Sequence, residues 1–139
     1  MDTNRKTAII VGVLFIIGTV AGILSVVFTS SILNAPDYLM KISANENKII
    51  IGALFVLVMG FALAMVPVVM FPIFKKYNEA LAIGYVVFRG ALETITHITV
   101  AISWLLLLPL SQEYAKAVSP DTSYFQTFGT LLQLSLIHI

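Results

Sequence analysis

Three long apolar stretches constrain this chain more than any other feature of its sequence. Residues 7–36 and 49–74 carry no charged side chain, and residues 78–108 carry only Glu79, Arg89 and Glu93. About 20 apolar residues in a helix cross the hydrocarbon core of a bilayer, where backbone polar groups must be hydrogen-bonded within the protein. The sequence therefore predicts an all-α fold, a polytopic transmembrane helical bundle.

The bundle is predicted to have three complete spans and the start of a fourth. The complete spans lie at about 8–29, 49–74 and 81–108. The helix of the third span is expected to begin at Asn78, which can serve as its N-cap, and to end before Pro109. A fourth helix is expected to begin at Ser119-Pro120-Asp121, where serine can cap a helix and proline fits its first turn, and to give a partial span at 122–139. We expect residues 1–139 to form a single membrane domain that is truncated at its C-terminus.

The composition argues against several classes of function. Only 11% of the residues are charged, against about 25% in a typical soluble domain. The net charge of +1 provides no basic surface for nucleic acid, and the absence of cysteine excludes disulfides and thiolate metal sites. We therefore expect the lipid bilayer as a partner, no nucleic acid, no cofactor and no metal.

The segment between the first two spans has two interpretations. Residues 34–37 favour the start of a short interfacial helix, on which Tyr38, Leu39 and Ile42 would face the membrane; a polar loop is the alternative. Ser43 to Glu46 has the pattern of a capping box for the second span.

The positions of lysine and arginine predict the orientation, because short cytoplasmic loops are enriched in both. The tight pair Lys75-Lys76 and the N-terminal Arg5-Lys6 favour the cytoplasm. Lys41, Lys48 and Lys116 would then lie outside. The sequence predicts a multi-pass protein of the cytoplasmic membrane with its N-terminus inside.

Small residues indicate where helices can approach one another. Gly18 and Gly22 form a GxxxG pattern in the first span, and Gly60 with Ala64 gives the same spacing in the second. Such spacing lets two backbones come close where lipid provides no hydrophobic drive for association. The partner is either another helix of this chain or a second molecule in a homo-oligomer.

The third span carries a polar stripe of Arg89, Glu93 and His97, spaced i, i+4 and i+8 along one face of a helix. If the membrane core runs from Ala82 to Trp104, with Trp104 as an interface aromatic, Glu93 lies near the midplane. A core from Gly90 to Leu110 would instead place Arg89 at the interface.

A charge at the centre of a membrane helix is costly, so the stripe needs partners. One interpretation is structural: Arg89 and Glu93 form an internal ion pair. The other is functional: the three residues line a cavity, with Glu93 and His97 as sites for a proton or a ligand. No catalytic residue is assigned from the sequence.

Several short motifs carry a family resemblance across most of the chain. They are Tyr38-Leu39, Asn45-Glu46-Asn47 followed by Ile51-Gly52-Ala53-Leu54, and Tyr85-x-x-Phe88-Arg89-Gly90-x-x-Glu93. With these motifs the chain resembles the bacterial and archaeal membrane proteins of the domain of unknown function 4386 family. The resemblance implies about six spans, of which this chain holds the N-terminal portion. Arg89 and Glu93 match positions where the family carries Arg and Glu, whereas His97 is less typical, and no activity is implied.

The last six residues, Leu134 to Ile139 (LSLIHI), resemble a translated sequencing adapter. We expect at least Ser135 to Ile139 not to be native, and we assign no role to His138; an aliphatic fourth span is the alternative.

The leading hypothesis is an integral membrane protein that acts in small-molecule or ion transport, or in sensing. The alternatives are an intramembrane enzyme that uses Glu93 and His97 for acid–base chemistry, and a structural subunit of a membrane partner.

Overall fold

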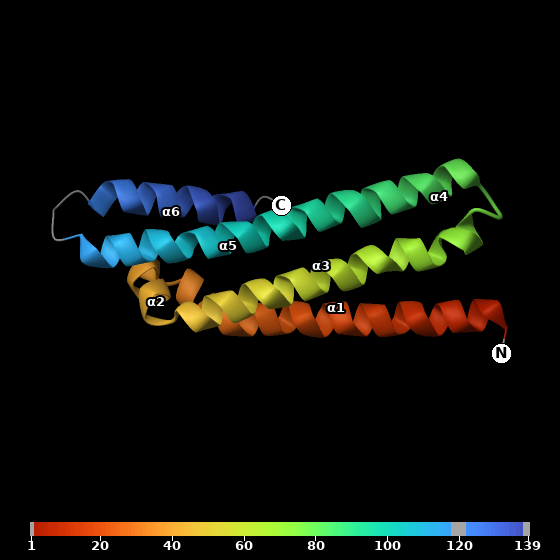
Figure 1. Cartoon of the computed structure of the whole chain (residues 1–139), viewed down its shortest axis with the longest axis horizontal. Coiled ribbons are helices and arrows are strands. Elements are labelled where there is room, and N and C mark those ends of the chain that lie inside the picture. The colour runs from red at the N-terminus through yellow and green to blue at the C-terminus, as the bar shows by residue number, and fades with distance from the viewer. Residues whose placement is uncertain (1, 118–121, 138–139) are drawn as a thin grey trace. The chain divides into compact units, whose positions relative to one another are not determined.

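A computed structural model describes residues 2–117 and 122–137, with the backbone alone at residue 122 and at 135–137. The elements are α1 (Thr3–Leu33), α2 (Tyr38–Ala44), α3 (Glu46–Phe74), α4 (Glu79–Tyr85), the π-helix η1 (Val86–Leu92), α5 (Glu93–Lys116) and α6 (Thr122–Ile137) (Figure 1). None of the residues described in these ranges forms a strand. The predicted all-α fold is confirmed.

Three helical stretches are long and apolar enough to cross a membrane: Thr3–Leu33, Glu46–Phe74 and the continuous run Glu79–Lys116. They confirm the three predicted spans. Large apolar side chains along them face outward, and both Phe61 and Phe88 are 70% exposed. Extended apolar surface of this kind is rare on water-soluble proteins and typical of contact with lipid. The chain is an integral membrane protein.

The third span is longer than the sequence predicts. The expected end before Pro109 is wrong, because α5 continues to Lys116. Proline removes one backbone N–H, and here it deprives only the Leu105 carbonyl of its helical donor, a loss that membrane helices tolerate. Beyond the proline, buried Ser111 donates its hydroxyl to the Leu108 carbonyl at 2.7 Å and stays in the helix.

The segment after the first span forms the short helix α2, as the first of the two interpretations predicts. Its apolar residues Tyr38, Leu39 and Ile42 are buried, however, so the expectation that they face the membrane is wrong. The Tyr38 hydroxyl donates to the Gln126 carbonyl at 3.2 Å. Burial against other parts of the protein removes more apolar surface from water than an interfacial position would.

The predicted capping box at Ser43 is wrong as well. Ser43 lies inside α2, and α3 begins at Glu46 after Asn45. The Asn45 side chain donates to the Lys41 carbonyl at 3.0 Å, and the Lys48 N–H donates to the Asn45 carbonyl at 3.0 Å. Asn45 therefore ends one helix and starts the next, because α2 extends through the position expected for the cap.

The chain divides into two compact units. Unit 1 comprises Met1–Ile23 and Val56–Ile98, and unit 2 comprises Leu24–Phe55 and Thr99–Ile139. Helices α1, α3 and α5 contribute residues to both units. The predicted cap Ser119-Pro120-Asp121 and the residue His138 lie outside the described residues, as do the side chains of residues 135–137.

Unit 2 has a core in which Trp104 packs against α3. The side chain of Trp104 is only 8% exposed, and its ring lies beside Gly52, which also faces Thr29. Its Nε1 makes no hydrogen bond with any residue that the structure describes. Trp104 is therefore packed against protein within the unit and does not face lipid.

Helix α6 is attached to the rest of unit 2 by specific contacts. The Gln133 amide donates to the carbonyl of Leu33, the last residue of α1, at 2.9 Å. Gly129 faces the Tyr38 hydroxyl so closely that a side chain at this position would collide with it. These contacts satisfy a carbonyl at a helix end, where no intrahelical donor is available.

Candidate functional site

The polar stripe lies entirely in unit 1, on η1 and the first turns of α5. The helix that carries it begins with a clear signal: the Asn78 side chain accepts the Leu81 N–H at 3.0 Å, which confirms Asn78 as the N-cap. From there α4, η1 and α5 follow without a break from Glu79 to Lys116.

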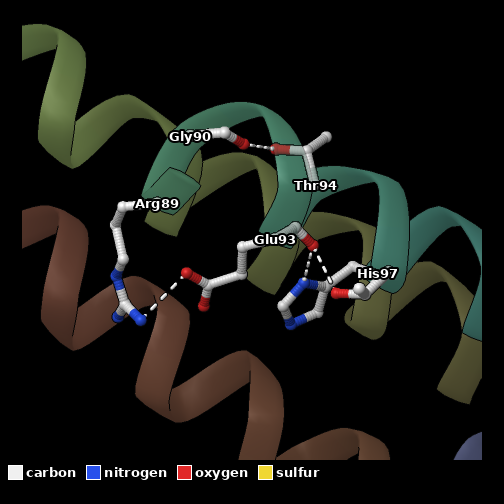
Figure 2. A network of polar contacts seen from close by, with 6 residues as sticks. Arg89, Gly90, Glu93, Thr94 and His97 are labelled. Atoms are coloured by element: carbon white, nitrogen blue, oxygen red, sulfur yellow. Dashed lines mark hydrogen bonds and ion pairs between the residues drawn. The ribbon is translucent and has the colours of Figure 1, made fainter. Parts of the chain in front are cut away.

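Arg89 and Glu93 form an ion pair. The Arg89 Nη1 lies 2.9 Å from the Glu93 Oε2, and the two side chains are 41% and 21% exposed. Figure 2 shows both side chains, together with His97, projecting from one side of the helix. The carboxylate is thus the more enclosed partner, whereas the guanidinium extends outward. The three residues share one face, although the intervening backbone is not a regular α-helix.

The π-helix η1 ends at the residue before Glu93, and side chains bind the carbonyls on either side of this junction. The Thr94 hydroxyl donates to the Gly90 carbonyl at 2.5 Å, and the Thr96 hydroxyl donates to the Glu93 carbonyl at 2.7 Å. His97 Nδ1 lies 2.7 Å from that same Glu93 carbonyl (Figure 2). Such π-helical segments interrupt the regular hydrogen-bond pattern and are frequent at functional sites.

The contact of His97 with a carbonyl determines its tautomer. A carbonyl oxygen only accepts hydrogen bonds, so Nδ1 carries the hydrogen. In the neutral ring, Nε2 then has an available lone pair. Nε2 can accept a proton or a hydrogen bond on the same face as the Glu93 carboxylate.

Helix α3 approaches closely at the stripe because its residues there are small. A methyl group at Gly60 would lie 2.7 Å from the Cβ of His97, well inside normal contact. A hollow of about 240 Å³ opens beside this contact, lined by Leu57, Gly60, Phe61, Thr94, His97 and Ile98. Thr94 and His97 are the polar members of its lining.

The other predicted packing residues also lie within unit 1. A methyl group at Gly18 would meet Leu63 at 3.0 Å, and one at Gly22 would meet Met59 at 2.8 Å. The GxxxG face of α1 is therefore directed at α3. The Ala64 carbonyl lies near Gly90, 3.7 Å from where a Cβ would be placed.

The described residues include no group of three or more His, Cys, Asp or Glu side chains that could hold a metal ion. The site can therefore be described as an ion pair with an adjacent histidine. Groups of this kind can bind protons, hydrogen-bonding solutes, or small ions that complement Arg89 or Glu93.

Sequence reasoning missed the π-helix and the roles of Gly90 and Thr94. A glycine between Arg89 and Glu93 was a signal for close helix contact, and the structure places Gly90 beside Pro67 of α3. The threonines were a weaker signal, because a hydroxyl in a membrane helix commonly bonds the preceding turn.

The family model described as "Domain of unknown function (DUF4386)" matches residues 10–137, which include the whole polar stripe. No curated protein matches the chain, and no solved structure does.

Proposed function

The chain belongs to the domain of unknown function family DUF4386, and from this premise we propose that it acts in proton-linked transport or in sensing. We propose further that it resides in the cytoplasmic membrane with its N-terminus inside. In this proposal Glu93 and His97 bind the proton, and Arg89 holds the Glu93 carboxylate in position.

One observation carries the proposal: an ion pair and a histidine with an available Nε2 share one face of a membrane helix. The Arg89–Glu93 separation of 2.9 Å and the 2.7 Å contact of His97 with the Glu93 carbonyl place the three groups together. Charges inside a bilayer cost from about 3 to more than 10 kcal/mol each, so they are typically retained for a role. A hollow of about 240 Å³ lies beside His97 and Thr94 on the same helix.

The stability of variants tests whether Arg89 and Glu93 form a coupled ion pair. Removing either Arg89 or Glu93 leaves the other charge unpaired. Because the unpaired charge that remains would lie in a membrane span, we expect Arg89→Ala and Glu93→Ala each to cost about 3 kcal/mol of stability. The double replacement by leucine should cost less than the sum of the two, because no unpaired charge remains. Thermal unfolding of the detergent-solubilised protein measures these losses.

The proposed proton-linked function is tested with the same double-leucine variant and with His97→Gln. Each is reconstituted in vesicles that contain a pH-sensitive dye, and proton entry is followed after a pH jump. The proposal expects faster entry with the wild-type protein than with either variant, while both variants remain folded. Equal entry for all three proteins would contradict the proposal, and a structural ion pair predicts that result. An intramembrane enzyme that uses Glu93 and His97 would also show equal entry.

A further inference from the structure

A second feature of unit 1 is the turn between α3 and α4, away from the polar stripe. Helix α3 ends at Phe74 and α4 begins at Glu79, and each belongs to a membrane span. A turn that joins two spans lies at a membrane surface. A hollow of about 390 Å³ opens there, lined by Met70, Phe74, Tyr77, Asn78, Leu81 and Tyr85.

The walls of this hollow suit an apolar ligand group. Phe74 and Tyr85 pack edge to face with ring centroids 5.3 Å apart. Asn78 is already engaged, because its side chain accepts the Leu81 N–H as the helix cap. Leu81 is 73% exposed and Tyr77 86% exposed, so the hollow is bordered by large side chains that no other described part of the chain covers. Tyrosines of this kind are enriched at membrane–water interfaces.

The turn that borders the hollow carries a net positive charge. Lys75 is paired with Glu79 at 2.8 Å and lies 5.9 Å from the centroid of the Phe71 ring. The next residue, Lys76, is exposed and makes no ion pair with any residue in the described ranges. Two lysines and one glutamate leave the turn with a net charge of +1. A cation next to an apolar hollow complements an amphiphile with a negative head.

We propose that this hollow binds an anionic phospholipid of the surrounding bilayer. The acyl chain lies against Phe74, Leu81 and Tyr85, and the phosphate is next to Lys76. Basic residues next to a membrane span attract anionic headgroups, and neutral lipids lack this attraction. The proposal is independent of the polar stripe and of the direction in which the chain crosses the membrane.

Fluorescence quenching by brominated lipids tests the site directly. The chain has a single tryptophan, Trp104, which lies buried in unit 2. The parent protein therefore supplies the background signal, and Leu81→Trp adds a second indole at the hollow. The protein is reconstituted in phosphatidylcholine vesicles that contain either brominated phosphatidylglycerol or brominated phosphatidylcholine. We expect half-maximal quenching of the added indole at a mole fraction of brominated phosphatidylglycerol about fivefold lower than that of brominated phosphatidylcholine. One lysine near an anionic headgroup would give a ratio of this size.

The matched control compares the two ends of α3. Lys76→Gln should abolish the preference for phosphatidylglycerol. Lys48→Gln makes the same change at an exposed lysine near the other end of the helix and should leave the preference intact. A second readout needs no added tryptophan: phosphatidylglycerol added to the detergent-solubilised protein should raise the Tm of the parent more than that of Lys76→Gln. Equal quenching by the two lipids, or an unchanged preference in Lys76→Gln, would overturn the proposal. The proposal would also be overturned if neither lipid quenched the added indole and Leu81→Cys cross-linked to a second copy of the chain.

Discussion

At the scale of single residues, the glycines of unit 1 differ in what they contact. Gly18 and Gly22 face the side chains of Leu63 and Met59, whose flexible ends can move aside. Gly60 instead faces the Cβ of His97, which is fixed to the backbone of α5. An added methyl group is therefore tolerated less well at Gly60, where α3 meets α5, than at Gly18 or Gly22, where α1 meets α3.

Gly60→Ala should destabilise the protein, because the new methyl group must push α3 away from His97. We expect a loss of about 1–3 kcal/mol, the usual cost of overpacking. Gly84→Ala is the matched control, since its methyl group would meet nothing within 4 Å, and alanine favours a helix over glycine by about 1 kcal/mol. Thermal unfolding in detergent compares the two. If Gly60→Ala were as stable as Gly84→Ala, the packing described for His97 would be incorrect.

At the scale of elements, the π-helix η1 is the feature that sets the third span apart. It inserts a wider turn between two α-helical segments, and the hydroxyls of Thr94 and Thr96 donate to the carbonyls of Gly90 and Glu93, on either side of its C-terminal end. A segment of this kind contains more residues per turn than an α-helix, so it can lose one residue and return to the regular pattern.

Deletion of Val87, an exposed residue of η1, should therefore be tolerated better than deletion of Ile102, an exposed residue of α5. The second deletion rotates the flanking helical segments by about 100° relative to each other, which misplaces the faces that pack. Deletion of Val87 should convert η1 to α-helix, so that the helical segments on either side of it keep the faces on which they pack. Folded yield and Tm in detergent are the measurements. Equal losses of folded yield and Tm for the two deletions would show that η1 cannot lose a residue and return to the α-helical pattern.

At the scale of the whole molecule, the order of the spans restricts the topology. Residues 2 and 76 are separated by two spans, and Lys41 lies between those spans. Residues 2 and 76 must therefore share one side of the membrane, with Lys41 on the other. The choice of side is our proposal and rests on the Lys75-Lys76 pair.

Cysteine labelling tests that orientation, because the native chain has no thiol. The variants Asp2→Cys, Lys41→Cys and Lys76→Cys are treated in intact cells with a membrane-impermeant maleimide. Lys41→Cys should react at once, whereas the other two should react only after the cells are permeabilised. The reverse pattern would invert the proposed orientation, and equal labelling of Lys41→Cys and Lys76→Cys would contradict the topology.

The sequence by itself determined the fold class, the three spans and the helix start at Asn78. These features follow from local chemistry: a bilayer requires a long apolar helix for each crossing, and an asparagine before a helix caps it wherever the helix lies. The i, i+4 spacing of Arg89 and Glu93 also indicated an ion pair before any tertiary contact was known.

Only the tertiary structure decided the positions of Trp104, Ser43 and the apolar face of α2, the extension of α5 past Pro109, and the contact between Gly60 and His97. Each depends on residues far apart in the sequence, or on which donor satisfies which carbonyl. Hydropathy describes how a segment prefers lipid to water, and it is the same for a tryptophan that faces lipid and one packed against Gly52. The shapes of the neighbouring helices decide between these positions, because packing requires close complementarity between atoms from different spans.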